Sequence, residues 1–389
     1  MPVIDDYSMS RFLPRTCYPS EKRWTDLSEI RFSNVVRATD RKLASCGFPI
    51  PVRLAITEIL NHLVPLDWLL FVTEGWYREH LLHQIRVALI TQWLLCQKVF
   101  SRSINKSLPL DKVKGALWAA ALIHDHGYAL SRLVQPVQIM MNQSAGFHGR
   151  RNAVVLRQFC DVYAGLFSRC LIEPPCRTEN ENATTGSHEK YEKWIREYLG
   201  PTKVGLEQKI LNKLLNRSGF YNHGLWSAMN LAAKLAEQGM PWDANKDDVE
   251  IVRLLIEAIA IHDHSDFQHG AFDMDRNPLS AILVLADELD EWKRVNVIRG
   301  KGEVIECCVN VNMHVGRMSI IYNYVRGDLM RAGWAIGGLR KEKKDAVERL
   351  SGAKGMPRLV AVVKATGKRR RGRRIPRSTP GRSARRRLT

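Results

Sequence analysis

The sequence lacks any apolar run long enough to cross a lipid bilayer. None of its hydrophobic stretches approaches the roughly eighteen residues that a membrane-spanning helix needs. Asp5 and Asp6 stand ahead of any apolar segment, which is not the pattern of a secretory signal. We therefore expect a cytoplasmic protein with no membrane contact.

Regular patterns of cysteine and glycine are also lacking. The eight cysteines form no C-x-x-C pair, so neither a structural zinc site nor a disulfide scaffold is expected. There is no phosphate-binding glycine loop and no internal repeat. The chain has 389 residues and 45% hydrophobic content, which is enough for one large or two ordinary folded domains. We expect its cysteines to be reduced and mostly buried.

Acidic residues are missing from the C-terminal tail. The formal net charge is +19, and the tail after Gly367 holds eleven basic residues and no acidic one, which leaves +8 for the rest of the chain. Its Gly, Pro and Ser content and its few apolar residues predict a disordered segment. The polycation at residues 368–389 would attract nucleic acid or other polyanions non-specifically; a solvated tail of little function is the alternative.

The spacing of apolar residues predicts a mainly α-helical chain. Trp76, Tyr77, His80 and His83 follow helical steps, in a helix that is expected to begin near Phe71. A loop-rich insertion is expected at about residues 173–188. Helices are expected over residues 25–44, 51–70, 71–94, 112–128, 130–141, 147–159, 205–216, 223–235, 248–261 and 277–292.

The pattern changes to strand alternation past residue 302. Apolar and polar residues alternate from Val309 to Val315, with both of these valines on the apolar face, and Gly316 allows a turn into a second strand over residues 320–325. A helix over residues 340–350 and a strand over 359–363 complete a small α+β appendage. The expected parts are an N-terminal helical segment that packs on the core (1–70), a helical-bundle domain (71–300), the appendage (301–366) and a disordered basic tail (367–389).

Histidine and aspartate recur at the ends of these predicted helices. One apolar run ends at His124-Asp125, where adjacent side chains diverge, so the imidazole can bind one metal while the carboxylate bridges to a second. Asp287 interrupts an otherwise apolar stripe, and a buried carboxylate is costly unless it is paired or bound to a metal. In chain order the set at helix ends or inner faces is His83, His124, Asp125, His223, His262 and Asp287.

This ordered set resembles the HD superfamily of metal-dependent phosphohydrolases. The resemblance covers residues 71–295, and its motifs include Leu-Ile-His-Asp-x-Gly-Tyr at 122–128, His223-Gly224, and Leu-Ala-Asp-Glu-Leu-Asp at 285–290. Glu291-Trp292 makes the chain most similar to a bacterial branch of that superfamily. Residues 265–270 read Ser-Asp-Phe-Gln-His-Gly, so membership of the Gly-Tyr-Pro branch, which cleaves cyclic dinucleotides, is not expected.

The resemblance implies an HD-type helical bundle around a dinuclear metal site. The residues implied to hold the first metal are His83, His124, Asp125 and Asp287. Those implied to hold the second are Asp125, which bridges, His223 and His262. There are five other candidates. His80 would support His83, and His264 would join or replace His262. His148 would replace His223 or contact substrate phosphate, and Arg150 and Arg151 would orient that phosphate or begin a solvated helix.

The implied chemistry follows from the ligand types. Four imidazoles and two carboxylates suit Mn, Fe, Co, Ni or Zn better than Mg, which prefers an all-oxygen shell. Two such ions lower the pKa of a bound water and offset the charge of a phosphoryl group. The expected function is hydrolysis of a phosphoester, in a nucleotide or related phosphate, with Asp125 and His124 as the catalytic residues.

Two other functions are compatible with the same residues. Some families with this ligand order use a diiron pair to activate oxygen, so a diiron oxygenase is the first alternative. The second is a nucleotide-binding or nucleic-acid-binding effector with a regulatory metal site. Six costly polar residues in a core argue against the effector, because a binding module does not need them.

Truncation after Gly367 should leave hydrolysis of a small substrate intact and should sharply weaken binding to DNA or RNA. Each phosphate that a basic side chain neutralises releases counterion, so the affinity of the intact protein should fall with salt at a log–log slope of roughly −0.9 per duplex contact. No base preference is expected, since arginines on a disordered chain meet phosphates first. Titration of a labelled duplex over a salt series measures both quantities. Equal affinity and slope after truncation would place the basic site in the folded part of the chain.

Overall fold

In the computed structural model the described residues are 3–13, 17, 30–73, 76–77, 80–104, 108–128, 192–193, 195–200, 203–215, 222–243, 246–263, 272–291, 294–298, 301–331 and 335–366. The predicted helices over residues 130–141 and 147–159, the predicted insertion at about 173–188 and the basic tail lie outside these residues.

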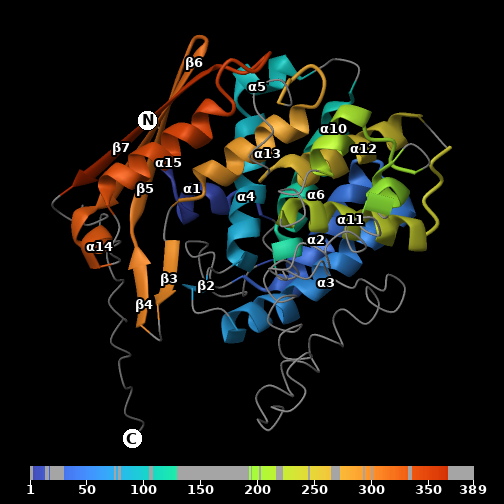
Figure 1. Cartoon of the computed structure of the whole chain (residues 1–389), viewed down its shortest axis with the longest axis horizontal. Coiled ribbons are helices and arrows are strands. Elements are labelled where there is room, and N and C mark those ends of the chain that lie inside the picture. Colours follow the sequence, from blue (N-terminus) through green and yellow to red (C-terminus); the bar gives the residue numbers. More distant parts are fainter. Residues whose placement is uncertain are drawn as a thin grey trace, which may run out of the picture.

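The described part of the chain is mainly helical, as predicted, with strands mostly toward the C-terminus (Figure 1). Among these residues, no helix combines the length and the apolarity that a membrane crossing requires. The helices are α1 (Asp6–Ser10), α2 (Phe32–Ser45), α3 (Ile50–Thr73), α4 (His80–Leu95), α5 (Lys98–Ser103), α6 (Leu110–Ile123), α10 (Gln208–Leu214), α11 (His223–Glu237), α12 (Lys246–Ile261), α13 (Pro278–Leu289), α14 (Arg326–Arg331) and α15 (Ile336–Glu348).

Helix α6 forms the centre of the helical body. It packs against α2, α3, α4, α12 and α13, which surround it in Figure 1, and every residue from Gly115 to Ile123 is buried. Its run of alanines allows the neighbouring helices to approach closely. The buried indole in this run has a hydrogen-bond partner, because Nε1 of Trp118 donates to Oγ1 of Thr39 at 2.9 Å. The helix that ends in the His-Asp pair is therefore held on all sides.

The predicted start of the helix near Phe71 is wrong. Helix α3 continues to Thr73, a short strand β2 (Trp76–Tyr77) follows, and α4 begins only at His80. Strand β2 pairs antiparallel with β3 (Arg294–Ile298), and β3 pairs with β4 (Lys301–Ile305). Trp and Tyr favour extended backbone, and pairing with a distant strand overrides the local helical spacing.

The C-terminal strands form a four-stranded sheet in the order β1-β5-β6-β7. Strands β5 (Cys307–His314) and β6 (Arg317–Val325) form the predicted hairpin, and Gly316 has the positive φ of 68° that its turn requires. Val309 is buried as predicted, whereas Val315 lies in the turn and is fully exposed, so its predicted place on the apolar face is wrong. Helix α15 connects β6 to the parallel strand β7 (Arg358–Thr366) and packs against β7.

The other edge of this sheet comes from the N-terminus. Strand β1 (Val3–Ile4) pairs antiparallel with β5, and helix α1, which follows it, packs against α4. In the inner strand β6, the hydroxyl of Tyr322 donates to the backbone oxygen of Glu288 in α13 at 2.9 Å. The sheet is therefore joined to the helical body both through the first residues of the chain and through the last helix of the bundle.

Leu117→Ala in α6 should lower the free energy of unfolding by about 2–5 kcal/mol, because it opens a cavity where neighbouring helices leave little room to collapse. Leu117 is fully buried. Leu110→Ala, in the exposed first turn of the same helix, is the matched control and should cost no more than about 1 kcal/mol. Chemical denaturation of both variants measures the difference. Equal losses would contradict the central place of α6.

Candidate metal centre

Four imidazoles surround the buried carboxylate of Asp125. Its Oδ1 lies 3.0 Å from Nε2 of His223, and the same oxygen lies 3.4 Å from Nε2 of His124 and 3.5 Å from Nε2 of His262. Its Oδ2 lies 3.3 Å from Nε2 of His83. Every one of the four rings therefore turns the same nitrogen, Nε2, toward this one side chain.

Asp287 closes the cluster on the side of His83. Its Oδ1 lies 3.0 Å from Nε2 of His83 and 3.9 Å from Nε2 of His124. The six side chains come from α4, the end of α6, the start of α11, the end of α12 and α13, which lie together in Figure 1. The structure thus brings together all six residues that the sequence analysis selected, and their role as metal ligands stays a prediction.

Backbone carbonyls fix the orientation of two of the rings. Nδ1 of His124 donates to the carbonyl oxygen of Ala121, and Nδ1 of His262 donates to that of Ile259, each at 2.8 Å. A carbonyl only accepts, so the ring proton sits on Nδ1 in both histidines. When these rings are neutral, Nε2 therefore presents a lone pair to the centre of the cluster.

Carboxylates orient the other two rings. Oδ2 of Asp290 lies 2.5 Å from Nδ1 of His83, while the other oxygen of Asp290 accepts from Nε of Arg86 at 2.9 Å. Oδ2 of Asp263 lies 3.0 Å from Nδ1 of His223. Metal-binding histidines are commonly held in this way, with the outer ring nitrogen donating to a carboxylate or carbonyl.

The sequence analysis assigned no role to these orienting residues, although their spacing carries a signal. Asp290 stands three residues after Asp287, and Arg86 three residues after His83, so each pair is one helical turn apart on adjoining helices. Asp263 directly follows His262, as Asp125 follows His124. A search for carboxylates one turn from each candidate ligand would have selected Asp290.

The donor set fits a metal cation. Nitrogen lone pairs and ionised carboxylate oxygens are both acceptors, and buried acceptors that face one another at 3.0–3.5 Å require a positive charge between them, either a proton or a metal. Imidazole nitrogens with carboxylate oxygens suit divalent transition metals. The arrangement therefore agrees with the expected cofactor class.

Two overlapping triads have the compactness of a metal site. The atoms of each triad lie within 4.8 Å of one another, and both triads contain His124. His223 belongs to neither, although its Nε2 is 3.0 Å from Asp125 and 3.2 Å from Nε2 of His262. The triads are His83, His124 and Asp287, and His124, Asp125 and His262.

Asp125 and His262 have the protonation states of metal ligands, whereas His223 carries a proton. Burial favours the neutral form of Asp125, but the imidazoles of His124 and His223 hold its pKa well below the usual range. Burial lowers the pKa of His262, which stays neutral. Burial also opposes protonation of His223, yet Asp125 and Asp263 raise its pKa to about 10. A metal at that position would take the place of the proton on His223, since ligands bind in their deprotonated form.

His80 lies at the edge of the cluster. Its Nδ1 is 3.6 Å from Oδ2 of Asp125, and its ring packs on Tyr128 with centroids 4.3 Å apart. Asp290 contacts the ring of His83, and the support of His83 by His80 stays a prediction. The remaining candidates, His148, Arg150, Arg151 and His264, lie outside the described residues.

The six residues of the cluster differ in their exposure to solvent. The side chains of His83, His124 and His262 are at most 1% exposed, whereas Asp287 is 29% and His223 16% exposed. Asp125 is 8% exposed, so Asp287 and His223 are the most exposed of the six residues.

Two glycines and a serine let the helices that carry these ligands meet. A Cβ on Gly127 would lie 2.3 Å from the carbonyl oxygen of His223, and one on Gly224 would lie 2.7 Å from Nδ1 of His262. Oγ of Ser227 accepts from the backbone N–H of Gly127 at 2.7 Å and lies 2.5 Å from the carbonyl oxygen of His124. The glycine after each histidine motif is thus explained by close backbone approach.

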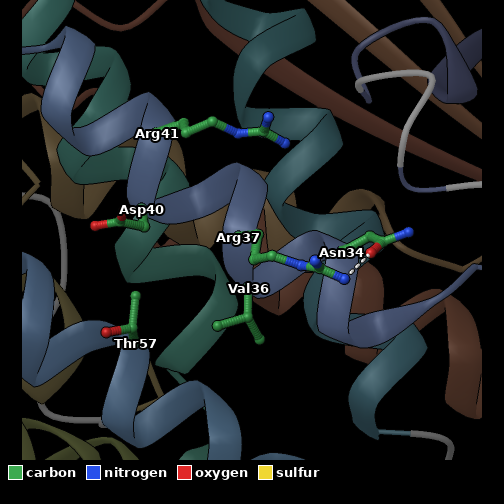
Figure 2. A pocket seen from close by; sticks show the side chains of 6 residues that line it. All are labelled: Asn34, Val36, Arg37, Asp40, Arg41 and Thr57. Carbon is green, nitrogen blue, oxygen red and sulfur yellow. Dashed lines mark hydrogen bonds between the residues drawn. The ribbon is translucent and has the colours of Figure 1, made fainter.

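A separate surface pocket lies between α2 and α3 (Figure 2). The side chain of Arg37 points toward Asn34 and donates to its Oδ1 at 2.7 Å, while Asp40 pairs with Arg53 at 2.8 Å. This pocket shares no residue with the His/Asp cluster and contains no imidazole or thiol. Its lining residues are Asn34, Val36, Arg37, Asp40, Arg41 and Thr57.

Comparison of the chain with protein-family models, with curated proteins and with solved structures gives no match.

Gly224→Ala should cost roughly 1–3 kcal/mol of stability, because the added methyl group overlaps the carbonyl oxygen of Ile259 and the ring of His262. Moving that ring should also weaken divalent metal binding. Thermal unfolding, together with a Mn²⁺ titration at a temperature where the variant is folded, measures both effects.

The control is Gly337→Ala in α15, where no atom lies within 4 Å of the added methyl group. It should leave metal binding unchanged and raise stability by no more than about 0.5 kcal/mol, because alanine loses less backbone entropy in a helix than glycine. If Gly224→Ala behaved like this control, close packing of α11 on α12 would not be what positions the rings.

Proposed function

We propose that the protein is a metal-dependent phosphohydrolase of the HD type that acts on a nucleotide or a related phosphate ester. The observation that carries the proposal is the ring of four inward-facing Nε2 atoms around the ionised carboxylate of Asp125. The order of these residues along the chain, which resembles that superfamily, supports the same function.

The proposed ligands divide into two sets that share Asp125. The first set is His83, His124, Asp125 and Asp287, and the second is Asp125, His223 and His262. Bound divalent metals would supply a Lewis acid that activates water near neutral pH and offsets negative charge on the phosphoryl group.

The protein's own part in the reaction is to keep the ligand side chains charged or neutral as required and oriented toward the centre of the cluster. Asp290 and Asp263 keep the rings of His83 and His223 turned inward, so the donor atoms need little rearrangement. Two described guanidinium groups contact this network: that of Arg86 donates to Asp290 at 2.9 Å, and that of Arg349 donates to the backbone oxygen of His262 at 3.0 Å. Among the described residues both of these guanidinium groups already have partners, so the metals would meet the substrate phosphate, beside the partly exposed Asp287.

Asp125→Ala should abolish phosphoester hydrolysis and remove most of the bound metal, while the protein stays folded. The carboxylate organises both ligand sets and contributes little to the apolar core, so its loss should affect the ions first. Metal analysis of the purified variant and phosphate release from a panel of nucleotides and phosphate esters with added Mn²⁺ measure the two effects. A variant with full metal content and full turnover would exclude the bridging role.

Asp111→Ala is the matched control, because this exposed aspartate in the first turn of α6 pairs with Lys114 and is remote from the cluster. It should retain both metal and activity. The same assay also distinguishes the proposed hydrolase from the main alternative, a diiron oxygenase. Oxygen consumption by the iron-loaded protein, with no phosphate released from any ester under anaerobic conditions with Mn²⁺, would replace the hydrolase by a diiron oxygenase.

A further inference from the structure

Four carboxylates follow one another at the end of α13. They are Asp287 and Glu288 in the last turn of the helix, and Asp290 and Glu291 immediately after it. The negative end of the helix dipole lies at the same place, so these charges are unfavourable there unless cations balance them. They divide into two pairs that face opposite ways.

The first pair faces the candidate metal centre. Oδ1 of Asp287 lies 3.0 Å from Nε2 of His83, and Oδ2 of Asp290 lies 2.5 Å from Nδ1 of the same ring. His83 is therefore held between two carboxylates of one short segment. A small shift of this segment would move a proposed ligand and the residue that orients another ligand together.

The second pair faces the C-terminal sheet and α15. Nζ of Lys343 in α15 lies 2.6 Å from Oε1 of Glu291 and 3.2 Å from Oε2 of Glu288. The hydroxyl of Tyr324 in β6 donates to Oε2 of Glu291 at 2.9 Å, and that of Tyr322 donates to the backbone oxygen of Glu288 at the same distance. The segment is thus fixed from its outer side by a helix and a strand that contribute no proposed ligand.

Lys343 is suited to this position. It is only 3% exposed, its partner Glu291 is 2% exposed, and its Nζ also lies 5.6 Å from the ring centroid of Tyr322. A buried ammonium group is costly without partners, and here two carboxylates and an aromatic ring surround it. Removal of the ammonium would leave like charges at the helix end with no other buried cation on that side among the described residues, and the segment would move to reduce the repulsion.

We infer that Lys343 is a positioning residue for the metal centre, holding Asp287 and Asp290 against His83 through Glu288 and Glu291. The inference rests on the proposed metal site. It assigns to the C-terminal α+β unit a part in that site: α15 and β6 set the position of the last ligand-bearing segment. Residues that orient ligands from outside commonly change metal affinity by about 10–100-fold when they are removed.

The test compares Mn²⁺ affinity by calorimetry in the full-length protein and three variants. Lys343→Met keeps the apolar stem and removes the charge, and it should weaken Mn²⁺ binding at least about 10-fold in protein that is folded by circular dichroism. Tyr324→Phe removes one hydroxyl from Glu291 and should weaken binding several-fold. Lys344→Met is the matched control on the same helix, since Lys344 is 70% exposed and pairs with Glu348. It should leave the affinity unchanged.

The outcomes separate the inference from the proposed function. Wild-type protein that binds no divalent metal would remove the proposed centre itself. Wild-type affinity in folded Lys343→Met would overturn the positioning role and leave the centre intact, even if the variant unfolded at a lower temperature. If Lys343→Met does not fold, Tyr324→Phe decides, and unchanged Mn²⁺ affinity in that variant would overturn the inference.

Discussion

The burial of one carboxylate, that of Asp125, is the constraint on which the rest of the structure depends. A buried charge without partners costs several kcal/mol, a large share of the stability of a folded domain. Here four imidazoles from four different helical segments turn toward this one charge. The apolar helix α6 places the carboxylate in the core, and the helices around it must then pack so that the rings meet it.

Much of this arrangement could be predicted from the sequence, because the patterns that mark the ligand-bearing helices are local. The apolar run before His124-Asp125 and the apolar stripe around Asp287 mark their helices, and a polar residue that interrupts such a pattern stands out. The strand at residues 76–77 could not be predicted, because it depends on a partner far away in the sequence. Its Trp76-Tyr77 strand exists through pairing with Val297 and Ile298, and no pattern near the aromatic pair indicates that partner.

Spacing makes Asp290 a candidate, but local patterns do not show which atoms an orienting residue contacts. Asp290 and Asp263 look like ordinary polar residues at helix ends, and only the fold shows that their carboxylates meet the outer nitrogens of His83 and His223. The position of Lys343 is still harder to predict from the sequence, since this residue lies in a lysine-rich helix whose other lysines are exposed. Its burial depends on α13, β6 and α15 coming together, which is a property of the tertiary packing.

The charge balance of the cluster bears on what it could bind. Asp125, Asp263 and Asp287 contribute three negative charges, the proton on His223 contributes one positive charge, and Asp290 is offset by Arg86. A single divalent ion would make the cluster neutral and leave little attraction for an anion. A second ion would leave the cluster positive, and an anionic phosphate would then supply the missing negative charge. A dinuclear centre therefore accords better with a phosphate ester as substrate than a mononuclear one, because Asp263 offsets the charge of His223 and the described ligands provide no other cation for the phosphate.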